Sequence, residues 1–274
     1  MRISTPTLAR EVARLRSVVQ TRMARTTVPI LNRLRKDPAA IMTEAWMDPD
    51  PWQAQILRKQ PSRLLLNCSR QVGKSTVAAA LALTIALLQD GSLVLLCSPS
   101  LRQSAELFLR VLGLYRALGR PIPTVRPRDN TTKLELANGS RIVSLPGSEA
   151  TIRGYSGAAL MIIDESARVP DDLYRAVRPM LAISRGLLAC LSTPWGKRGW
   201  FYEEWQGPRN WCRVEVNAFQ CPRIPADFLD EEKAALGDTW FRQEYMCSFE
   251  DTLESLFRQQ DIEQMLTGDV QPLF

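Results

Sequence analysis

Histidine is absent from the 274 residues of the sequence. The chain therefore has no imidazole that could act as a general base near neutral pH or ligate a metal. The six cysteines form no C-x-x-C pair, so a zinc site is not expected, and several lie in apolar runs typical of small buried residues in a reducing cytoplasm. No apolar stretch is long enough to cross a bilayer, and the N-terminus lacks a signal-peptide core.

Acidic residues are slightly outnumbered by basic ones. Lysine and arginine total 35 against 29 acidic residues, which gives a net charge of +6 and a sequence pI of about 9.2. This balance favours an anionic partner, nucleic acid first, although a basic but inert surface has the same composition. The hydrophobic content of 45% is normal for a globular core, and the length fits one large α/β domain or two small ones.

The segment Cys68–Thr76, CSRQVGKST, has the pattern of a phosphate-binding loop. It follows the apolar residues 64–66 and precedes the alanine-rich run 77–88, an order that predicts strand, tight loop and helix. Successive N–H groups and a helix N-terminus in such a loop can wrap a polyphosphate. The pattern G-x-x-x-x-G-K-[ST] is matched except at Cys68, where a glycine is expected. The alternative is an ordinary strand-to-helix connection with an exposed lysine.

Residues in and near this loop have distinct expected roles. Gly73 lets the backbone approach the phosphates, Lys74 reaches the β- and γ-phosphates, and the Ser75 hydroxyl binds Mg²⁺. Gln53 lies just upstream of the predicted strand, and its amide can match the N6 and N7 edge of adenine. The alternative for Gln53 is a surface glutamine beside a packing tryptophan.

Two acidic residues follow another apolar run, 160–163. Asp164 and Glu165 therefore stand at the C-terminal end of a predicted strand, where ligands bind in parallel α/β sheets. We expect Asp164 to hold Mg²⁺ through water and Glu165 to orient and deprotonate an attacking water. Alternatively, the two acids cap the next helix near Pro170.

The remaining apolar runs complete an α/β pattern. Asn138-Gly139 between two strand-like runs is a strong hairpin signal. We expect a mostly parallel sheet flanked by helices, with a helical lid at the C-terminus. The expected strands are 92–97, 133–136, 141–145, 186–191 and 212–216, and the expected helices are 101–118, 200–205 and a region beyond about residue 227.

Basic segments are the candidates for DNA contact. Residues 1–36 carry nine basic residues against one acid and predict a basic amphipathic helix that Pro29 ends or kinks. Such a helix is either an arm that meets DNA or a neighbouring subunit, or a helix packed on the domain. Lys197 and Arg198 lie in a Gly-Lys-Arg-Gly loop that could contact DNA phosphates.

Taken in order, these motifs resemble the ATPase domain of the large terminase subunit of tailed bacteriophages. A missing first glycine is typical of that family, so Cys68 fits the resemblance. The similarity covers roughly residues 48–257. It rests on PWQ at 51–53, SRQVGKS at 69–75, TIRG at 151–154, LMIIDE at 160–165, LSTP at 191–194 and FRQEY at 241–245.

The resemblance implies roles for individual residues. Arg70 would sense the γ-phosphate, and Arg153 would be an arginine finger acting in trans on the adjacent subunit, unless it is a surface arginine paired with an acid such as Glu149. Ser192 and Thr193 would couple hydrolysis to movement, or else only cap a turn. The expected catalytic residues are Glu165, Lys74, Arg153 and Arg70. The expected metal ligands are Ser75 and Asp164, and the expected nucleotide-binding residues are Gln53, Ser69, Arg70, Gln71, Val72, Gly73, Lys74, Ser75 and Thr76.

The resemblance also implies a domain layout of the RecA-like (ASCE) P-loop NTPase type. The expected parts are a basic N-terminal extension (1–47), an ATPase core (48–205), a lid (206–257) and a linker (258–274). The nuclease domain that terminases carry after such a linker is not expected in this chain, so no nuclease activity is expected.

The implied function is ATP hydrolysis, with ATP and Mg²⁺, that moves double-stranded DNA into a procapsid in the host cytoplasm. The implied partners are the portal protein, the small terminase subunit and further copies of the chain in a pentameric ring, with no membrane. A helicase-type ATPase shares the motifs but needs a second RecA-like domain, and strand displacement would identify it. A non-enzymatic module that only binds ATP is the other alternative, and measured turnover would exclude it.

Overall fold

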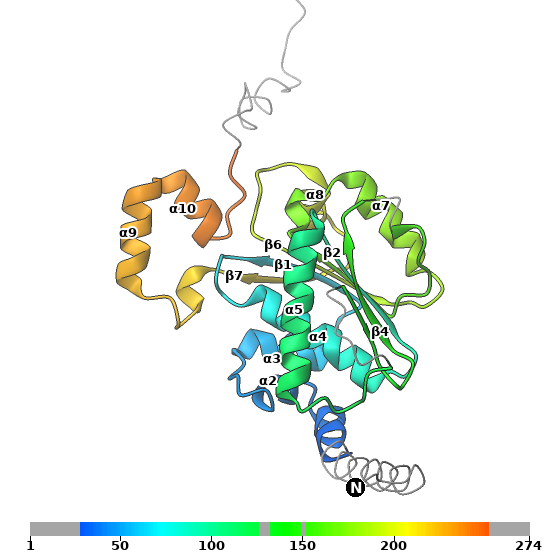
Figure 1. The fold of residues 1–274 in the computed structure, drawn as a ribbon. Coiled ribbons are helices and arrows are strands. Elements are labelled where there is room, and N and C mark those ends of the chain that lie inside the picture. The colour runs from blue at the N-terminus through cyan, green and yellow to red at the C-terminus, as the bar shows by residue number, and fades with distance from the viewer. Residues whose placement is uncertain (1–27, 126–131, 149–151, 252–274) are drawn as a thin grey trace, which may run out of the picture.

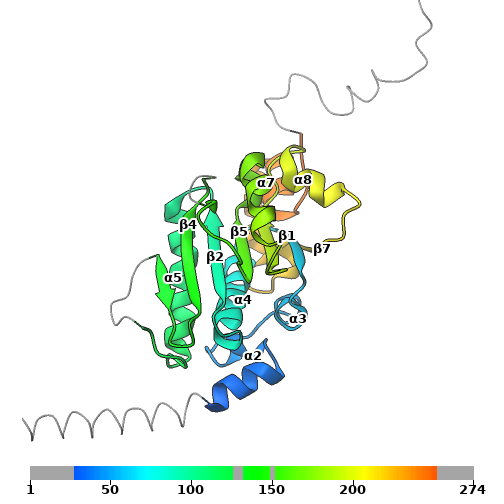
Figure 2. The ribbon, with the colours of Figure 1, turned by 90° about the vertical axis from the view of Figure 1, so that its right-hand side faces the viewer.

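A twisted seven-stranded sheet lies at the centre of the structure, with helices on both faces (Figures 1 and 2). The structure is a computed structural model that describes residues 28–125, 132–148 and 152–251. The strand order is β3-β4-β2-β5-β6-β1-β7, and every neighbouring pair is parallel except β3 with β4. The prediction of a mostly parallel α/β sheet is confirmed.

Strands and helices alternate along the chain. The strands are β1 (Arg63–Cys68), β2 (Leu93–Ser98), β3 (Lys133–Glu135), β4 (Arg141–Pro146), β5 (Leu160–Asp164), β6 (Leu187–Ser192) and β7 (Cys212–Val216). The helices are α2 (Ala40–Thr43), α3 (Pro51–Lys59), α4 (Lys74–Leu88), α5 (Leu101–Ala117), α7 (Asp171–Met180), α8 (Gly199–Gln206), α9 (Ala226–Leu236) and α10 (Asp238–Tyr245), with the short 3₁₀ turns η1 (Ser166–Arg168) and η2 (Ala218–Gln220). Residues 28–36 are also helical.

Side chains of the central strands alternate between two apolar layers. Leu64 and Leu66 of β1 belong to the layer formed with α2, α3, α4 and α5. Leu65, between them, belongs to the layer formed with α7 and α8. Because both faces are covered, these strands are nearly continuous apolar runs, as parallel sheets require.

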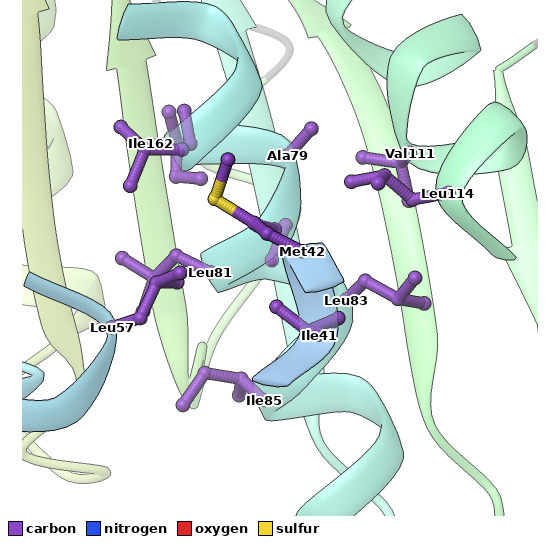
Figure 3. Packing of buried hydrophobic residues seen from close by; sticks show 14 of the residues in the cluster. Ile41, Met42, Leu57, Ala79, Leu81, Leu83, Ile85, Val111, Leu114 and Ile162 are labelled. Carbon is purple, nitrogen blue, oxygen red and sulfur yellow. The ribbon is translucent and has the colours of Figure 1, made fainter. Parts of the chain in front are cut away.

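Helix α4 is the centre of the larger layer. Every residue from Val77 to Leu87 is buried, so the helix has no polar face. It lies against the sheet and is covered from outside by Ile41 and Met42 of α2 and by Val111 of α5 (Figure 3). This burial fixes the position of the loop that enters α4 at Lys74.

The predicted hairpin around Asn138-Gly139 is present. β3 pairs antiparallel with β4, and Gly139 has a φ of +82°, which favours glycine. The Asn138 amide also donates to the Ala86 carbonyl at 3.0 Å, which attaches the turn to the end of α4.

Two of the predicted domain segments contain residues that belong to the core of the structure. In the extension predicted for residues 1–47, Ile30, Leu34 and Ile41 are buried in the same apolar layer as α4. In the lid predicted for residues 206–257, β7 pairs in parallel with β1 and forms an edge of the core sheet. The helix at 28–36 contains Pro29, and whether this proline ends or kinks a longer basic helix stays a prediction.

Helices α9 and α10 form a small unit beside the sheet (Figure 1). Leu229, Phe241 and Tyr245 build an apolar cluster of their own. The segment after α10 returns to the core, where the Asn67 amide donates to the Cys247 carbonyl at 2.9 Å. That this unit acts as a lid stays a prediction. The basic arm upstream of residue 28 and the predicted linker at 258–274 lie outside the described residues. Over the part of the chain that the structure describes, no helix has the length and hydropathy to span a bilayer.

Truncation of Leu83 in α4 tests the structural role of this helix. Leu83 is fully buried, so Leu83→Ala leaves a cavity under the sheet and should lower the free energy of unfolding by about 2–5 kcal/mol. Urea denaturation measures the change. Leu109→Ala on α5 is the control, because Leu109 is 47% exposed and its loss should cost no more than about 0.5 kcal/mol. Equal losses in both variants would contradict the central role of α4.

Candidate functional site

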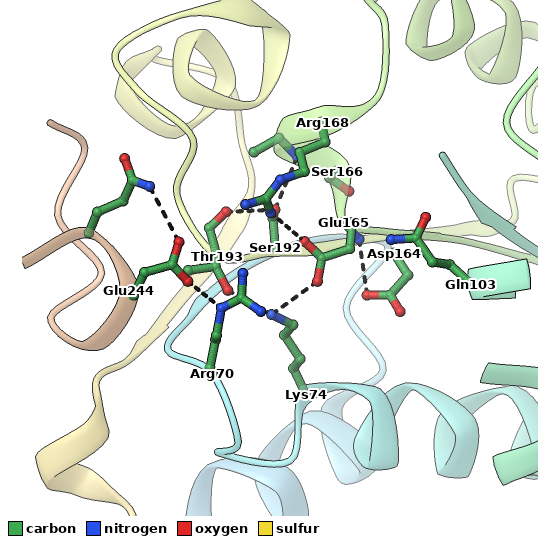
Figure 4. A network of polar contacts seen from close by, with 12 residues as sticks. Arg70, Lys74, Gln103, Asp164, Glu165, Ser166, Arg168, Ser192, Thr193 and Glu244 are labelled. Carbon is green, nitrogen blue, oxygen red and sulfur yellow. Dashed lines mark hydrogen bonds and ion pairs between the residues drawn. The ribbon is translucent and has the colours of Figure 1, made fainter. Parts of the chain in front are cut away.

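Three segments meet at the carboxyl edge of the sheet. β1, β6 and β5 are neighbours and parallel, with Asn67 opposite Ser192 and Asp164 opposite Leu191. The loop after β1, the acids that end β5 and the hydroxyl residues that end β6 therefore come together (Figure 4). Ligands bind at this edge in open α/β sheets.

The loop between β1 and α4 has the backbone of an anion-binding turn. Gln71 and Gly73 have left-handed φ values of +63° and +94°, and α4 begins at Lys74. Such turns direct successive N–H groups into one concavity at a helix N-terminus. The Ser69 N–H donates to the Val216 carbonyl at 2.9 Å, and Val72 is buried, so both ends of the loop are anchored.

Lys74 joins the three segments. Its Nζ donates to Thr193 Oγ1 at 2.7 Å and lies 3.3 Å from Glu165 Oε1. The lysine side chain is only 12% exposed. Lys74, which was predicted to bind phosphate, is therefore in direct contact with the predicted catalytic base and with one of the two predicted coupling residues (Figure 4).

Glu165 is held in place by a second cation, Arg168. Glu165 has a left-handed φ of +51°, a conformation that is uncommon outside glycine and often found at functional sites. Arg168 Nη1 donates to Glu165 Oε2 at 2.8 Å, and its guanidinium lies 4.3 Å from the centre of the Trp195 ring. Sequence analysis missed Arg168, although a cation three residues after the acid is a pairing signal.

Asp164 is a buried carboxylate with little neutralising charge. It is 7% exposed, and the hydrogen bond it accepts comes from the Glu165 N–H at 3.0 Å. Burial, with the charge of Glu165 beside it, raises the pKa of Asp164 to about 6. A carboxylate in this setting suits a hard divalent cation, and the Ser75 hydroxyl lies in the first turn of α4, next to Lys74. Both residues offer oxygen atoms of the kind that Mg²⁺ prefers, and the Mg²⁺ site itself stays a prediction.

Ser192 and Thr193 have different surroundings. Only Thr193 of this pair contacts Lys74 in the described structure. Ser192 Oγ accepts from the Ala167 N–H at 3.2 Å and donates to the Thr193 carbonyl at 2.7 Å. Ser192 thus ties the end of β6 to the turn that follows Glu165.

Arg70 leaves the loop on the side of α10. Its guanidinium pairs with the carboxylate of Glu244, a residue that is 5% exposed. The backbone N–H of Arg70 also donates to the backbone carbonyl of Glu244 at 3.3 Å. The hydrogen bond from the guanidinium to the Glu244 carboxylate raises the pKa of Arg70. Glu244 was not a predicted site residue, and only its place in the FRQEY segment gave a signal.

A cavity of about 880 Å³ extends from the loop toward α3. Gln53 lines it, but the side chain is 2% exposed and its amide is used within the protein. Gln53 Oε1 accepts from the Asp50 N–H at 3.0 Å, and Nε2 donates to the Gly73 carbonyl at 3.3 Å. The contact of Gln53 with adenine stays a prediction. Gln71, Ser75 and Thr76 also line this cavity.

Three predicted residues lie away from the loop. Arg153 is exposed and lines a separate cavity of about 700 Å³ with residues of α7. Lys197 pairs with Asp251 at 3.1 Å. The guanidinium of Arg198 lies 6.0 Å from the centre of the Trp195 ring. The roles of Arg153 in trans and of Lys197 and Arg198 in DNA binding stay predictions.

The fold and the groups at the carboxyl edge of the sheet define the class of protein. A parallel sheet with a Gly-Lys-Ser loop between β1 and α4, and with two acids that end β5, is the architecture of a P-loop NTPase domain. The model of the family "Terminase large subunit, T4likevirus-type, N-terminal" matches residues 65–264, more than half of the chain. The chain belongs to this family.

Two kinds of relatives agree with the family match. The terminase large subunit of Escherichia phage T5 is 28% identical over 191 residues, which are 66% of this chain and 42% of that protein. The chain therefore spans less than half the length of this curated relative. The large terminase ATPase domain of Thermus phage P74-26 has the same fold, with a TM-score of 0.66, 21% identity and coverage of 76% of this chain and 96% of that one. The large terminase of another thermophilic bacteriophage, at 11% identity, has a TM-score of 0.57 over 78% of this chain and 53% of that one.

Substitution of Gly73 tests whether the loop depends on its backbone shape. A Cβ at this position would lie 2.7 Å from Gln53 Nε2 and would occupy a φ of +94°. Gly73→Ala should therefore cost about 1–3 kcal/mol of stability and weaken the binding of inorganic tripolyphosphate. Thermal unfolding and calorimetric titration measure the two effects.

Gly91→Ala is the matched control for this substitution. Gly91 also has a positive φ, but nothing lies within 4 Å of its Cβ position, and it precedes β2 at the opposite edge of the sheet. Its tripolyphosphate affinity should equal that of the parent. A Gly73→Ala protein with parental affinity would show that the loop backbone does not bind the anion.

Proposed function

We propose that the chain is an ATP-hydrolysing motor domain of a DNA-packaging terminase. The observation that carries the proposal is the contact of Lys74 with both Glu165 and Thr193 at the carboxyl edge of the sheet. Family membership supports it, and one relative of the same fold was solved in complex with ADP. In this proposal, the β- and γ-phosphates of ATP take the place that Glu165 and Thr193 occupy around Lys74.

In this proposal, the residues at the carboxyl edge of the sheet have separate roles in phosphoryl transfer to water. Glu165, oriented by Arg168, accepts the proton of the attacking water, and Lys74 stabilises charge on the transferring oxygens. Ser75 and Asp164 would hold Mg²⁺, which neutralises charge on the β- and γ-phosphates when bound. Thr193 is the hydroxyl that we assign to the coupling of hydrolysis with movement, because it contacts Lys74 directly.

The partners and setting are part of the same proposal. Terminase family membership supports double-stranded DNA as the polymer that the motor moves. We further propose the portal protein, the small terminase subunit and a ring of copies of this chain as partners, at a procapsid in the host cytoplasm. DNA contact by Lys197, Arg198 and the basic residues 1–36 would be to phosphates only, and so independent of base sequence.

Two variants separate binding from chemistry. Lys74→Ala removes the cation at the phosphates and should weaken ATP binding and abolish hydrolysis. Glu165→Gln keeps the shape but cannot accept a proton, so it should bind ATP and Mg²⁺ while turnover falls by about 10²–10⁴-fold. Calorimetry and phosphate release measure the two properties.

Exposed Lys59 on α3 provides the control, because it is a lysine of the same charge outside the cavity. Lys59→Ala should retain parental affinity and turnover. Hydrolysis near the parental rate in Lys74→Ala would place the nucleotide site elsewhere. Strand displacement by the parent protein would favour a helicase over a packaging motor.

Arg153 tests the proposed action in trans. Arg153→Ala should bind ATP almost normally but lose about 10³–10⁵-fold in turnover, because a finger stabilises only the charge of the transition state. Arg153→Ala and Glu165→Gln subunits, each inactive, should regain activity when mixed, since some interfaces then combine an intact base with an intact finger. Phosphate release at fixed total protein measures the recovery.

The control for the mixing experiment is exposed Arg175, which lines the same cavity as Arg153. Arg175→Ala should leave turnover within a few-fold of the parent. A mixture that stays inactive while both variants still assemble would contradict the finger, as would full activity of Arg153→Ala alone.

A further inference from the structure

Arg223 is a charged side chain at the cavity beside the loop between β1 and α4. It lies between η2 and α9, and it lines the cavity with Asp50 and Gln53. Arg223 Nη1 and Nη2 donate to the two Asp50 carboxylate oxygens at 2.8 Å and 2.7 Å, and Nη2 also donates to the Val72 carbonyl at 3.3 Å. The guanidinium is therefore fixed between the start of α3 and the loop.

The hydrogen bonds of Arg223 use N–H donors at the edge of the guanidinium, so they do not cover its planar face. Over half of the side chain, 52%, is still exposed despite the bidentate pair with Asp50. A planar cation whose edge donors are engaged can still stack on an aromatic ring. Because Asp50 neutralises it, Arg223 adds little net charge at the phosphates.

The side-chain amide of Gln53, which lines the same cavity, is already engaged within the protein in this structure. Gln53 is buried, with both amide atoms bonded to the protein. The side chains that line the same cavity include the apolar Met42, Met47 and Pro49, which suit the surface of a ring. The cavity thus offers apolar side chains and a planar cation to the flat faces of a base.

We propose that Arg223 is the stacking platform for the base of the bound nucleotide. This inference rests on the proposed function and adds a residue that determines base affinity. The Asp50 carboxylate positions the guanidinium, and the ring of the base lies on its exposed face. Since a guanidinium stacks on any aromatic base, Arg223 should strengthen nucleotide binding without contacting the phosphates.

Comparison of ATP with inorganic tripolyphosphate tests the proposal, because the two ligands share the phosphates and differ in the nucleoside. Arg223→Ala removes the platform, and Arg223→Lys keeps the charge opposite Asp50 but removes the plane. Both variants should bind ATP about three- to thirty-fold more weakly than the parent and bind tripolyphosphate with unchanged affinity. Calorimetric titration in the presence of Mg²⁺ measures both affinities, and thermal unfolding verifies the fold of each variant.

Arg242→Ala is the matched control. Arg242 makes a similar two-bond pair with Glu250, at 2.8 Å and 3.0 Å, and its side chain is 49% exposed, but it does not line the cavity. This variant should bind both ligands like the parent.

The possible results separate the inference from the proposed function. Equal weakening of both ligands in the Arg223 variants would assign Arg223 to the phosphates and overturn the platform. Unchanged ATP affinity in Arg223→Lys would overturn it as well, because charge alone would suffice. A parent protein that binds neither ligand would overturn the proposed function itself.

Discussion

The parallel, in-register pairing of β1, β6 and β5 is the constraint on which the site depends. It places the ends of three strands side by side, so that Lys74, Thr193 and Glu165 meet although Lys74 and Thr193 are 119 residues apart in the sequence. A one-residue shift in this register would turn each side chain to the other face of the sheet. The two apolar layers hold the register, because each strand has buried residues on both faces.

Helix α4 transmits this constraint to the loop. A helix that is buried on all sides cannot rotate or slide without exposing apolar surface, so the N–H groups of its first turn have a fixed direction. The left-handed backbone at Gly73 completes the turn, and Gln53 holds the Gly73 carbonyl from α3. The anion site is thus organised before a ligand binds, which reduces the entropy that binding must overcome.

The chain after β7 is attached to the loop, to the start of α3 and to β1. Glu244 of α10 pairs with Arg70, Arg223 pairs with Asp50 at the start of α3, and the Cys247 carbonyl accepts from Asn67 of β1. The first two of these contacts connect the chain after β7 to Arg70 and Asp50, which line the cavity. The proposed stacking on Arg223 and the predicted phosphate contact of Arg70 would therefore involve the same C-terminal segment.

The sequence alone determined what depends on neighbours in the chain. Alternation of apolar runs with a Gly-Lys-Ser loop and an Asn-Gly turn predicted the strands, the hairpin and the helix at α4, because turn chemistry and periodicity are local. The apolar run before Asp164 also placed the acids at a strand end. Only the tertiary structure decided which groups from distant segments meet: Thr193 with Lys74, Glu244 with Arg70, and β7 with β1. Strand order and side-chain packing set these contacts, and residues far apart in the sequence carry no local signal of them.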